Sequence, residues 1–589
     1  MMVQAPERSE AWWREATGYQ IYPASFKDSN GDGIGDLNGI TSSLDYLKEL
    51  GVDFIWISPV YDSPNHDMGY DIRNYEKISA QYGTLEDMDR LITEAKARDL
   101  RVIMDLVVNH TSAEHHWFQE SRKSKTNPYS NWYIWRDPKY DENGTRHPPT
   151  NWRGIFPGST WTYEPQRDQY YFHLFLPEQP DLNWENHETR RAVYSTAVDF
   201  WIRRGIDGFR VDMANAYGKE QSFPDAHIVD SSQPTQPMEI PWFLNNPQVH
   251  KWLQEIRREV LDPWREDLVL IAEIPGTAPD EVLRYVSAAR HEIDLTLDGM
   301  FFVAGNHWSL PLHDLRLHKL PELKEAIAAT QGLLKGTDAW TSAFLENHDA
   351  PRSVSHFGPG DDTRGPSAAK MLALFNTTLS GTLIVYQGQE IGMTNVPKDS
   401  WKIQDFQDKM IHRYFREVAE RYPGNAGMQK RAFEAALGRG RDNSRTPMQW
   451  SAEGPHGGFS TGTKDLWLRI NPNYKTINVH AQLQGEESVL SFWKDSITRR
   501  RHLADVLVHG DFEVVDIQNE HLFSFWKVSR NRKAFVVLNF SSEARSQNLP
   551  EQVERGSYRL VVSTAVKEQG RFQDLMQPWE GRLYVEQEG

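Results

Sequence analysis

Residues 101–110 read Arg-Val-Ile-Met-Asp-Leu-Val-Val-Asn-His, an apolar run that ends in two polar residues. A short run rich in branched apolar residues is typical of a strand buried on both faces of a parallel sheet. The same pattern recurs five times along the chain, at 52–59, 206–212, 268–273, 343–349 and 383–390. The sequence therefore predicts parallel strands whose C-terminal ends carry polar residues.

Amphipathic helices are expected between these strands. Apolar residues recur three and four positions apart over 39–50, 85–98 and 189–204, which is the spacing of one helical face. Such an alternation forms either an open doubly wound sheet or a closed barrel. The recurrence of polar residues at strand ends favours the barrel, because its active sites collect there. We therefore expect an α/β fold built on a (β/α)8 TIM barrel.

Two regions depart from the alternation. Residues 111–180 are rich in Trp, Tyr, Pro, Asn and His without a clear helix, which predicts an inserted loop-rich subdomain after the third strand. From residue 509 short alternating segments predict a C-terminal antiparallel β-domain. The expected division is a catalytic barrel of 1–110 and 181–508, the inserted subdomain 111–180 and the β-domain 509–589.

Composition excludes several classes of function. The chain has 589 residues, with 65 Lys and Arg against 82 Asp and Glu, so its net charge is −17. No nucleic-acid partner is expected, because phosphate binding needs a basic surface. The chain has no cysteine, which excludes disulfides and thiolate chemistry.

A membrane partner is not expected either. The first residues contain no apolar leader segment, and no apolar run reaches the roughly 18 residues that cross a bilayer. These features predict a cytoplasmic protein, although a leader removed beforehand remains an alternative.

The polar strand ends combine side chains that suit cleavage of a glycosidic bond. In such a site one carboxylate attacks the anomeric carbon and a protonated carboxyl group donates to the leaving oxygen. Taken singly, each aspartate is more simply a helix cap or a surface charge. As a set they predict a glycosidase site at the barrel mouth, made of Asp105, His110, Arg210, Asp212, Glu273, His348 and Asp349.

Five motifs carry a family resemblance in their order and spacing. They are Asp-Leu-Val-Val-Asn-His at 105–110, Gln-Pro-Asp-Leu-Asn at 179–183, Gly-Phe-Arg-Val-Asp at 208–212, Ile-Ala-Glu-Ile-Pro at 271–275 and Phe-Leu-Glu-Asn-His-Asp at 344–349. From Tyr19 to at least Trp450 the chain resembles the α-amylase family (glycoside hydrolase family 13), in its oligo-1,6-glucosidase and maltase branch. The resemblance implies that Asp212 is the nucleophile, Glu273 the acid/base, and Asp349 a carboxylate that stabilises the transition state.

The resemblance also implies how glucose is bound. His110 and His348 correspond to residues that bind its hydroxyls, and Asp105 supports them. Arg210 is expected to keep Asp212 ionised through its adjacent charge.

The family further implies a closed pocket. Asp67 corresponds to a residue that holds a hydroxyl at the non-reducing end, and Tyr70 to one that stacks on the sugar. Arg441 matches an arginine that helps to close this end, although on the residues alone a weak surface ion pair is the simpler interpretation. A pair of Asp67 and Arg441 leaves room for one glucose, which implies exo-action.

A metal loop is expected near the N-terminus. Residues 28–36, Asp-Ser-Asn-Gly-Asp-Gly-Ile-Gly-Asp, place oxygens at alternate positions and Gly at the sixth, like the start of a calcium loop. Gly39 stands where an EF-hand needs a bidentate Glu, so a metal-free turn is the alternative. The family carries a metal loop at this point, which implies structural Ca²⁺, with Mg²⁺ as the alternative, on Asp28, Asn30, Asp32, Asp36 and the carbonyl of Ile34.

The expected activity is that of a retaining exo-acting α-glucosidase on maltose-like short α-glucosides, with some transglucosylation. In this branch Val after the nucleophile goes with α-1,6 enzymes and Thr or Ala with α-1,4 enzymes, whereas Met213 matches neither. Residues 214–217 are more similar to the corresponding sequence of maltases than to that of oligo-1,6-glucosidases. Specificity for α-1,4 linkages is therefore favoured over the α-1,6 specificity of an oligo-1,6-glucosidase. A sucrose isomerase has an Arg-Leu-Asp-Arg loop, and this chain has only Leu-Arg-Leu-His at 315–318. A further alternative is a non-catalytic relative, such as a transporter subunit. Such relatives need a membrane anchor and usually lack the catalytic carboxylates, whereas this sequence has every carboxylate and no apolar run long enough for an anchor.

Overall fold

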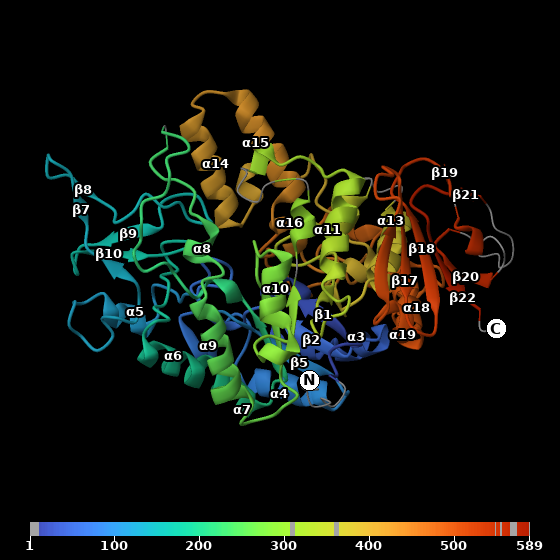
Figure 1. Ribbon diagram of the computed structural model, residues 1–589, viewed down its shortest axis with the longest axis horizontal. Coiled ribbons are helices and arrows are strands. Elements are labelled where there is room, and N and C mark those ends of the chain that lie inside the picture. The colour runs from blue at the N-terminus through green and yellow to red at the C-terminus, as the bar shows by residue number, and fades with distance from the viewer. Residues whose placement is uncertain are drawn as a thin grey trace.

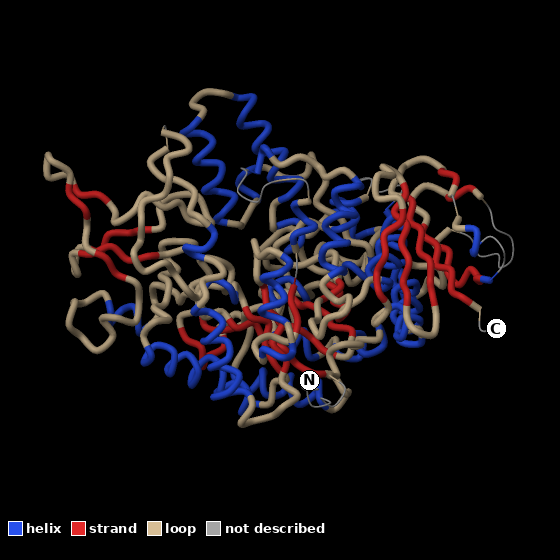
Figure 2. The backbone as a smooth tube through the Cα atoms, viewed as in Figure 1, coloured by secondary structure: helices blue, strands red, loops and turns tan. Residues whose placement is uncertain are grey.

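The computed structural model describes residues 11–231, 233–297, 299–304, 306, 312–358, 365–547, 549–553, 557–565 and 574–587. Its centre is a sheet of eight strands in the order β13-β12-β11-β5-β2-β1-β15-β14 (Figures 1 and 2). The strands are β1 Thr17–Ile21, β2 Phe54–Ile57, β5 Arg101–Leu106, β11 Gly208–Val211, β12 Val269–Glu273, β13 Leu295–Leu297, β14 Ser342–Ala343 and β15 Thr382–Tyr386.

The eight strands form a closed barrel. Every neighbouring pair is parallel, and a parallel bridge between Thr296 and Thr341 joins the two ends of the sheet. The residues of β2, β11 and β15 are all buried, which explains why these strands are largely apolar, with Arg210 of β11 as a charged exception. The expected (β/α)8 barrel is confirmed, and β1 and β13 complete the six strands that the sequence indicated.

The expected helices are present with changes in detail. The stretch 85–98 contains α4 (Leu85–Lys96), which begins at a capping box of Thr84 and Asp87. The stretch 39–50 is divided between α2 (Leu37–Thr41) and α3 (Leu44–Leu50). The stretch 189–204 is α6 (His187–Val193) and α7 (Phe200–Arg204), joined by a π-helical segment at Tyr194–Asp199. Further helices are α9 Gln248–Ile256, α10 Pro279–Val286, α11 Leu320–Gly332, α13 Gly365–Thr378 and α18 Val489–His502.

The segment after β5 forms a sheet of its own beside the barrel. Strands β6 (Trp135–Arg136), β10 (Gln169–Phe172) and β9 (Trp161–Glu164) pair antiparallel in that order. Figure 1 shows this segment at the left end of the molecule, with the small hairpin of β7 (Lys139–Tyr140) and β8 (Arg146–His147) at its edge. The sequence indicated no helix here, but α5 (His116–Ser121) forms and buries Trp117 and Phe118.

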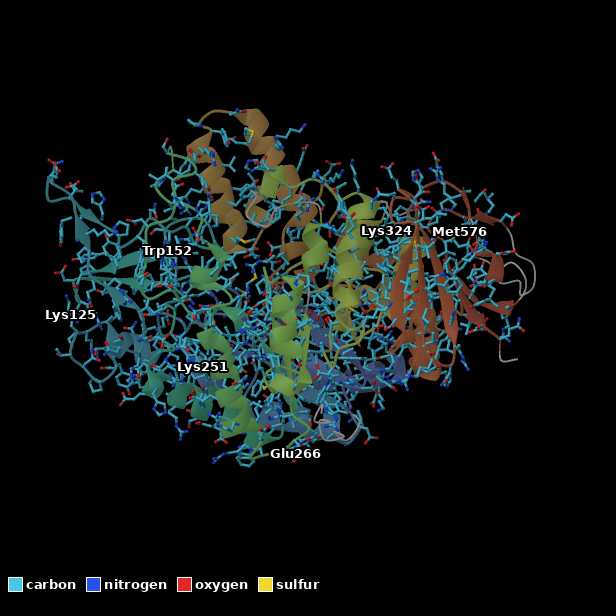
Figure 3. The ribbon with its side chains drawn as sticks, in the orientation of Figure 1. Lys125, Trp152, Lys251, Glu266, Lys324 and Met576 are labelled. Atoms are coloured by element: carbon cyan, nitrogen blue, oxygen red, sulfur yellow. The ribbon has the colours of Figure 1, made fainter. Side chains whose placement is uncertain are left out.

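A five-stranded antiparallel sheet lies at the opposite end. Its order is β16-β17-β18-β22-β20, formed by Asp511–Val515, Leu522–Val528, Lys533–Asn539, Gly581–Glu586 and Tyr558–Ser563. Lys324 of α11, labelled in Figure 3, donates from Nζ to the carbonyl oxygens of Asp516 and Asn519 at 2.8 and 2.7 Å. Buried Arg500 of α18 donates to the carbonyl oxygens of Thr377 and Leu379 beside this sheet. The expected C-terminal β-domain is confirmed, whereas domain limits at 110, 180 and 508 stay a prediction.

One element was absent from the sequence analysis. Helices α14 (Lys409–Arg421) and α15 (Ala426–Arg439) form a hairpin that projects at the top of Figure 1. Ion pairs join α14 to the inserted segment through Arg153 and Glu417 at 2.6 Å, and to the loop after β11 through Arg421 and Asp230 at 3.1 Å. Among all helices that are described, none is long and apolar enough to cross a membrane.

Candidate active site

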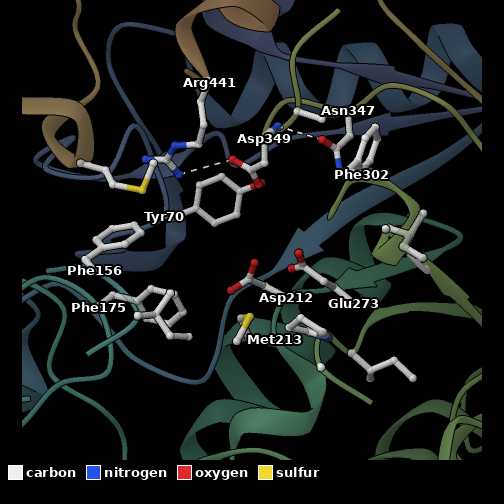
Figure 4. Close-up of a pocket in the computed structure, with 18 of the residues that line it drawn as sticks. Tyr70, Phe156, Phe175, Asp212, Met213, Glu273, Phe302, Asn347, Asp349 and Arg441 are labelled. Carbon is white, nitrogen blue, oxygen red and sulfur yellow. Dashed lines mark hydrogen bonds and ion pairs between the residues drawn. The ribbon is translucent and has the colours of Figure 1, made fainter. Parts of the chain in front are cut away.

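A cavity of about 500 Å³ lies at the C-terminal ends of the barrel strands (Figure 4). Nine of the eleven residues expected to act on or bind the substrate line it: Asp67, Tyr70, His110, Arg210, Asp212, Met213, Glu273, Asp349 and Arg441. The other two, Asp105 and His348, are almost fully buried. Parallel strands bring these residues together because all their C-terminal ends meet at one mouth.

Arg210 connects three carboxylates of the site. Its position in β11 is level with Asp105 in β5, so both side chains leave the same face of the barrel. Nη1 of Arg210 donates to Asp105 Oδ1 at 2.7 Å and to Asp212 Oδ1 at 2.9 Å, and Nη2 donates to Glu273 Oε2 at 2.6 Å. One guanidinium thus holds the expected nucleophile and the expected acid/base in a defined relation, and Figure 4 shows their carboxyl groups side by side.

The proton affinity of Asp212 differs from the expectation. Burial raises the pKa of Asp212 well above its usual value; the charge of Arg210 lowers it, and Glu273 and Asp105 raise it further. Arg210 does contact Asp212, but it is shared with two other carboxylates and cannot compensate for burial. Arg210 thus lowers the pKa of Asp212, as expected from its adjacent charge, but burial and the neighbouring carboxylates outweigh that effect.

Asp349 is in the opposite electrostatic situation. Burial would raise the pKa of its carboxyl group, but the interactions with His348, Arg445 and Arg441 hold that pKa well below the usual range. Arg445 Nη2 donates to Asp349 Oδ1 at 2.7 Å, and Arg441 Nη1 donates to the same oxygen at 3.3 Å. Asp349 therefore stays a carboxylate, which suits a group that stabilises positive charge.

Asp105 and His348 lie behind the cavity wall. The rings of Tyr70 and His348 stack with centroids 5.3 Å apart and planes at 1°, and Tyr70 Oη lies 2.7 Å from His348 Nε2. Asp105 accepts from Trp56 Nε1 at 3.0 Å and from Tyr70 Oη at 3.3 Å. Asp105 thus positions Tyr70 and Arg210, and His348 positions Tyr70. Direct contact of His348 with a glucose hydroxyl stays a prediction.

One end of the cavity is closed by an ion-pair network. Arg441 Nη2 donates to Asp67 Oδ1 at 3.1 Å, as the family resemblance implied. The sequence analysis missed Asp408, which accepts from Arg441 Nε at 2.7 Å and from Nη2 at 2.8 Å. Asp408 is also the N-cap of α14. Its position before a helix was the only local feature of the sequence that could have drawn attention to this residue. Gln179 Nε2 bonds Asp67 Oδ2 at 3.2 Å, which adds the 179–183 motif to the network.

Two further cations were missed. Arg445 stands in the segment after Arg441, and its Nε donates to the carbonyl oxygen of His348 at 2.9 Å. Lys219 is fully buried, and its Nζ pairs with Asp181 Oδ2 at 2.9 Å. Neither residue follows a strand, so the rule that found the other charged groups did not apply to them.

Met213 adopts an unusual backbone conformation. Its φ and ψ are both 44°, in the left-handed region that non-glycine residues seldom occupy. The side chain is 6% exposed, lines the cavity and packs with apolar residues that include Phe243 and Leu244. The backbone turn directs this side chain to the cavity wall beside Asp212, as Figure 4 shows.

The 28–36 loop shows part of the pattern expected for a metal loop. Asp28 accepts from the backbone N–H groups of Asn30, Gly31 and Gly33, and Asn30 and Asp32 each accept from the residue two positions on. Both oxygens of Asp36 are engaged by Ser29 and Gly39. Within the described residues, no three acidic or histidine side chains converge as a metal cluster. The oxygen donors are of the type that Ca²⁺ or Mg²⁺ binds, but here they accept from backbone N–H groups and the carboxylates are not gathered around one point.

Comparisons with known proteins agree with this site. Residues 20–510 match the model of the alpha amylase catalytic domain, so the chain belongs to the α-amylase family of glycoside hydrolases. It is 42% identical to an α-glucosidase of Candida albicans over 98% of this chain and 99% of that protein. An oligo-1,6-glucosidase of Parageobacillus thermoglucosidasius is 41% identical over 97% of this chain and 98% of that protein. The crystal structure of isomaltulose synthase from Erwinia rhapontici NX5 superposes with a TM-score of 0.88 at 36% identity, covering 98% of this chain and all of that one.

Proposed function

We propose that the protein is a retaining, exo-acting α-glucosidase that releases glucose from the non-reducing end of short α-glucosides. The observation that carries the proposal is the Arg210 cluster, in which one guanidinium binds both Asp212 and Glu273. The contact between Asp67 and Arg441 supports exo-action, because it closes one end of the cavity.

In the proposed reaction Asp212 attacks the anomeric carbon while Glu273 gives its proton to the leaving oxygen. Asp349 stabilises the positive charge that develops on the sugar ring, and the guanidinium groups of Arg441 and Arg445 keep it ionised. Glu273 then takes a proton from water, which attacks the glucosyl ester of Asp212. An acceptor alcohol in place of water gives transglucosylation.

The proposed substrates are maltose-like α-1,4 glucosides, with α-1,6 glucosides as the alternative. Relatives named α-glucosidase and oligo-1,6-glucosidase match the chain at similar identity, which keeps both specificities open. The test is kcat/KM on maltose, isomaltose, nigerose, sucrose and starch, with early product followed by NMR. We expect glucose as the α-anomer, with maltose ahead of isomaltose and little action on starch. Early β-glucose, or rapid internal cleavage of amylose, contradicts the proposal.

We also propose that the 28–36 loop binds one structural divalent cation, Ca²⁺ before Mg²⁺, through Asp28, Asn30, Asp32, Asp36 and the Ile34 carbonyl. Hydrogen bonds between this loop and a distant part of the chain support a structural role. The backbone N–H of Asp28 donates to the carbonyl oxygen of Phe459 at 2.9 Å, and the backbone N–H of Trp467 donates to the carbonyl oxygen of Gly33 at 3.1 Å. A cation that binds only the native state raises Tm, so chelation should lower Tm without abolishing activity at low temperature. Loss of all activity with an unchanged Tm contradicts the structural role.

A further inference from the structure

Gln20 is a buried polar residue in the barrel interior, outside the set of site residues that the sequence indicated. It lies in β1, level with Trp56 of β2 and Tyr386 of β15, and is fully buried. Its Nε2 atom lies 2.8 Å from Nδ1 of His348 and 3.3 Å from Oγ of Ser58. Gln20 therefore contacts the ring of a residue that stands behind the cavity wall, and it can act on the site through that ring.

The opposite nitrogen of His348 must carry a hydrogen. This Nε2 atom lies 2.9 Å from Asp349 Oδ2 and 2.7 Å from Tyr70 Oη, and Figure 4 shows Tyr70 beside Asp349. The pKa of Asp349 is held well below its usual range, so its oxygens are acceptors only. A bare Nε2 would place its lone pair against a carboxylate oxygen, which is repulsive. A hydrogen on Nε2 turns the same contact into a hydrogen bond.

The same hydrogen gives the neighbouring bonds a consistent direction. Asp105 pairs with Arg210 and therefore acts as an acceptor, and Tyr70 Oη lies 3.3 Å from its Oδ2. The single hydroxyl hydrogen of Tyr70 can point either to Asp105 or to His348 Nε2. When Nε2 carries a hydrogen, Tyr70 donates to Asp105 and accepts from His348. Every acceptor in this chain of bonds then has a donor.

The amide of Gln20 completes the chain at its other end. In a neutral imidazole only one nitrogen carries a hydrogen, so a hydrogen on Nε2 leaves Nδ1 of His348 as a bare acceptor. The two hydrogens of the Gln20 amide nitrogen point to this Nδ1 and to Ser58 Oγ. An amide turned the other way would place its oxygen against the bare nitrogen. Gln20 thus supplies the donor that this form of His348 requires.

We propose that Gln20 is a positioning residue that holds His348 in the neutral form with its hydrogen on Nε2, directed at Asp349. Arg441 and Arg445 both bind Oδ1 of Asp349, whereas Oδ2 faces the histidine. A hydrogen moved to Nδ1 would leave a lone pair facing Oδ2, which would displace this carboxylate or raise its pKa. The consequence for catalysis rests on the proposed α-glucosidase function, in which Asp349 stabilises the transition state. The effect should therefore fall on kcat more than on KM.

Nitrogen NMR of the wild-type protein tests the position of the hydrogen directly. Protonated and bare imidazole nitrogens differ widely in ¹⁵N chemical shift, and protein labelled with ¹⁵N-histidine reports both nitrogens of each ring. The signals of His348 are identified by their absence from His348→Asn. Near neutral pH we expect Nε2 to be protonated and Nδ1 to be bare. A hydrogen on Nδ1, in the neutral or in the charged ring, overturns the proposal.

A matched pair of variants tests the effect on catalysis. Gln20→Met keeps the side-chain length and removes the donor, so the Nδ1 signal of His348 should shift. On the best α-glucoside kcat should fall about three- to tenfold, the size expected for one lost hydrogen bond, with KM nearly unchanged. Gln331→Met makes the same change at a buried amide of α11 that bonds Ser380, and it should lower Tm without changing kcat or the Nδ1 signal.

The outcomes separate this proposal from the one on which it rests. Wild-type kcat in Gln20→Met, or an equal loss of kcat in Gln331→Met, contradicts a positioning role of Gln20. Absence of turnover by the wild type on every α-glucoside overturns the α-glucosidase proposal instead. The NMR measurement still decides in that case whether Gln20 sets the hydrogen of His348.

Discussion

The two halves of the cavity are built on different principles. On the glucose side, Arg210, Arg441 and Asp349 each contact two or more charged partners, so their positions are determined by directed bonds. On the opposite side, Phe302 and Met410 line the cavity with apolar side chains. Hydrogen bonds and ion pairs lose most of their value when a partner moves, whereas apolar contacts tolerate changes of shape. Substitutions on the glucose side should therefore cost more than those on the opposite side.

The largest effect is expected for the reacting carboxyl groups. Asp212→Asn and Glu273→Gln should each lower kcat by at least about 10³-fold while the fold is kept, because one removes the nucleophile and the other the acid. Steady-state kinetics and thermal melting check this. The control is Asp225→Asn, which removes an exposed charge paired with Lys139 and should leave kcat and Tm unchanged. Near-wild-type turnover in either active-site variant would refute the assigned roles.

A smaller loss is expected when the closed end is opened. Arg441→Ala leaves buried Asp408 without its main partner and frees Asp67, so kcat/KM should fall by about 10²-fold and Tm should decrease. Arg441→Lys keeps the positive charge but loses the planar guanidinium that bonds Asp67 and Asp408 together, so it should recover only part of the activity. Arg469→Ala removes a largely exposed pair with Asp405 and should change neither quantity. An Arg441→Ala enzyme with unchanged kcat/KM would show that this network does not shape the glucose site.

Met213 lies between the two halves and should affect specificity more than rate. Met213→Val should raise the isomaltose-to-maltose ratio of kcat/KM and Met213→Thr should lower it, each by about tenfold. Both residues are branched at Cβ and strain a backbone with φ of 44°, so some loss of Tm is expected in both. Met213→Leu, which is not branched there, separates strain from specificity. Unchanged ratios with only Tm altered would mean that Met213 has a purely structural role.

The smallest effect is a shift in pH dependence. Asp105 raises the pKa of Asp212 and also binds the Arg210 atom that contacts Asp212. Asp105→Asn removes one negative charge, so the pKa of Asp212 should fall. The nucleophile acts only when ionised, and activity is lost as pH falls through its pKa. The acid limb of the kcat/KM profile should therefore move to lower pH, and a shift to higher pH would contradict the raised pKa of Asp212.

Local patterns revealed the residues that stand at strand ends. Asp212, Glu273 and Asp349 each follow an apolar run, and the parallel sheet made their convergence predictable. Asp408 and Arg445 follow no strand, and the one local signal for either residue is the position of Asp408 before α14. The hairpin of α14 and α15, which carries Met410 and Arg439 to the cavity, was likewise not indicated by the strand pattern.

The sequence by itself determined the barrel, the C-terminal sheet and the set of carboxyl groups, because apolar periodicity and strand-end positions are local properties. Only the tertiary structure decided which groups share a counter-charge. Arg441 and Asp67 are 374 residues apart, and their contact depends on the closure of the whole barrel. Burial depends in the same way on every packed neighbour, which is why the pKa values of Asp212 and Asp349 move in opposite directions although both are aspartates at strand ends.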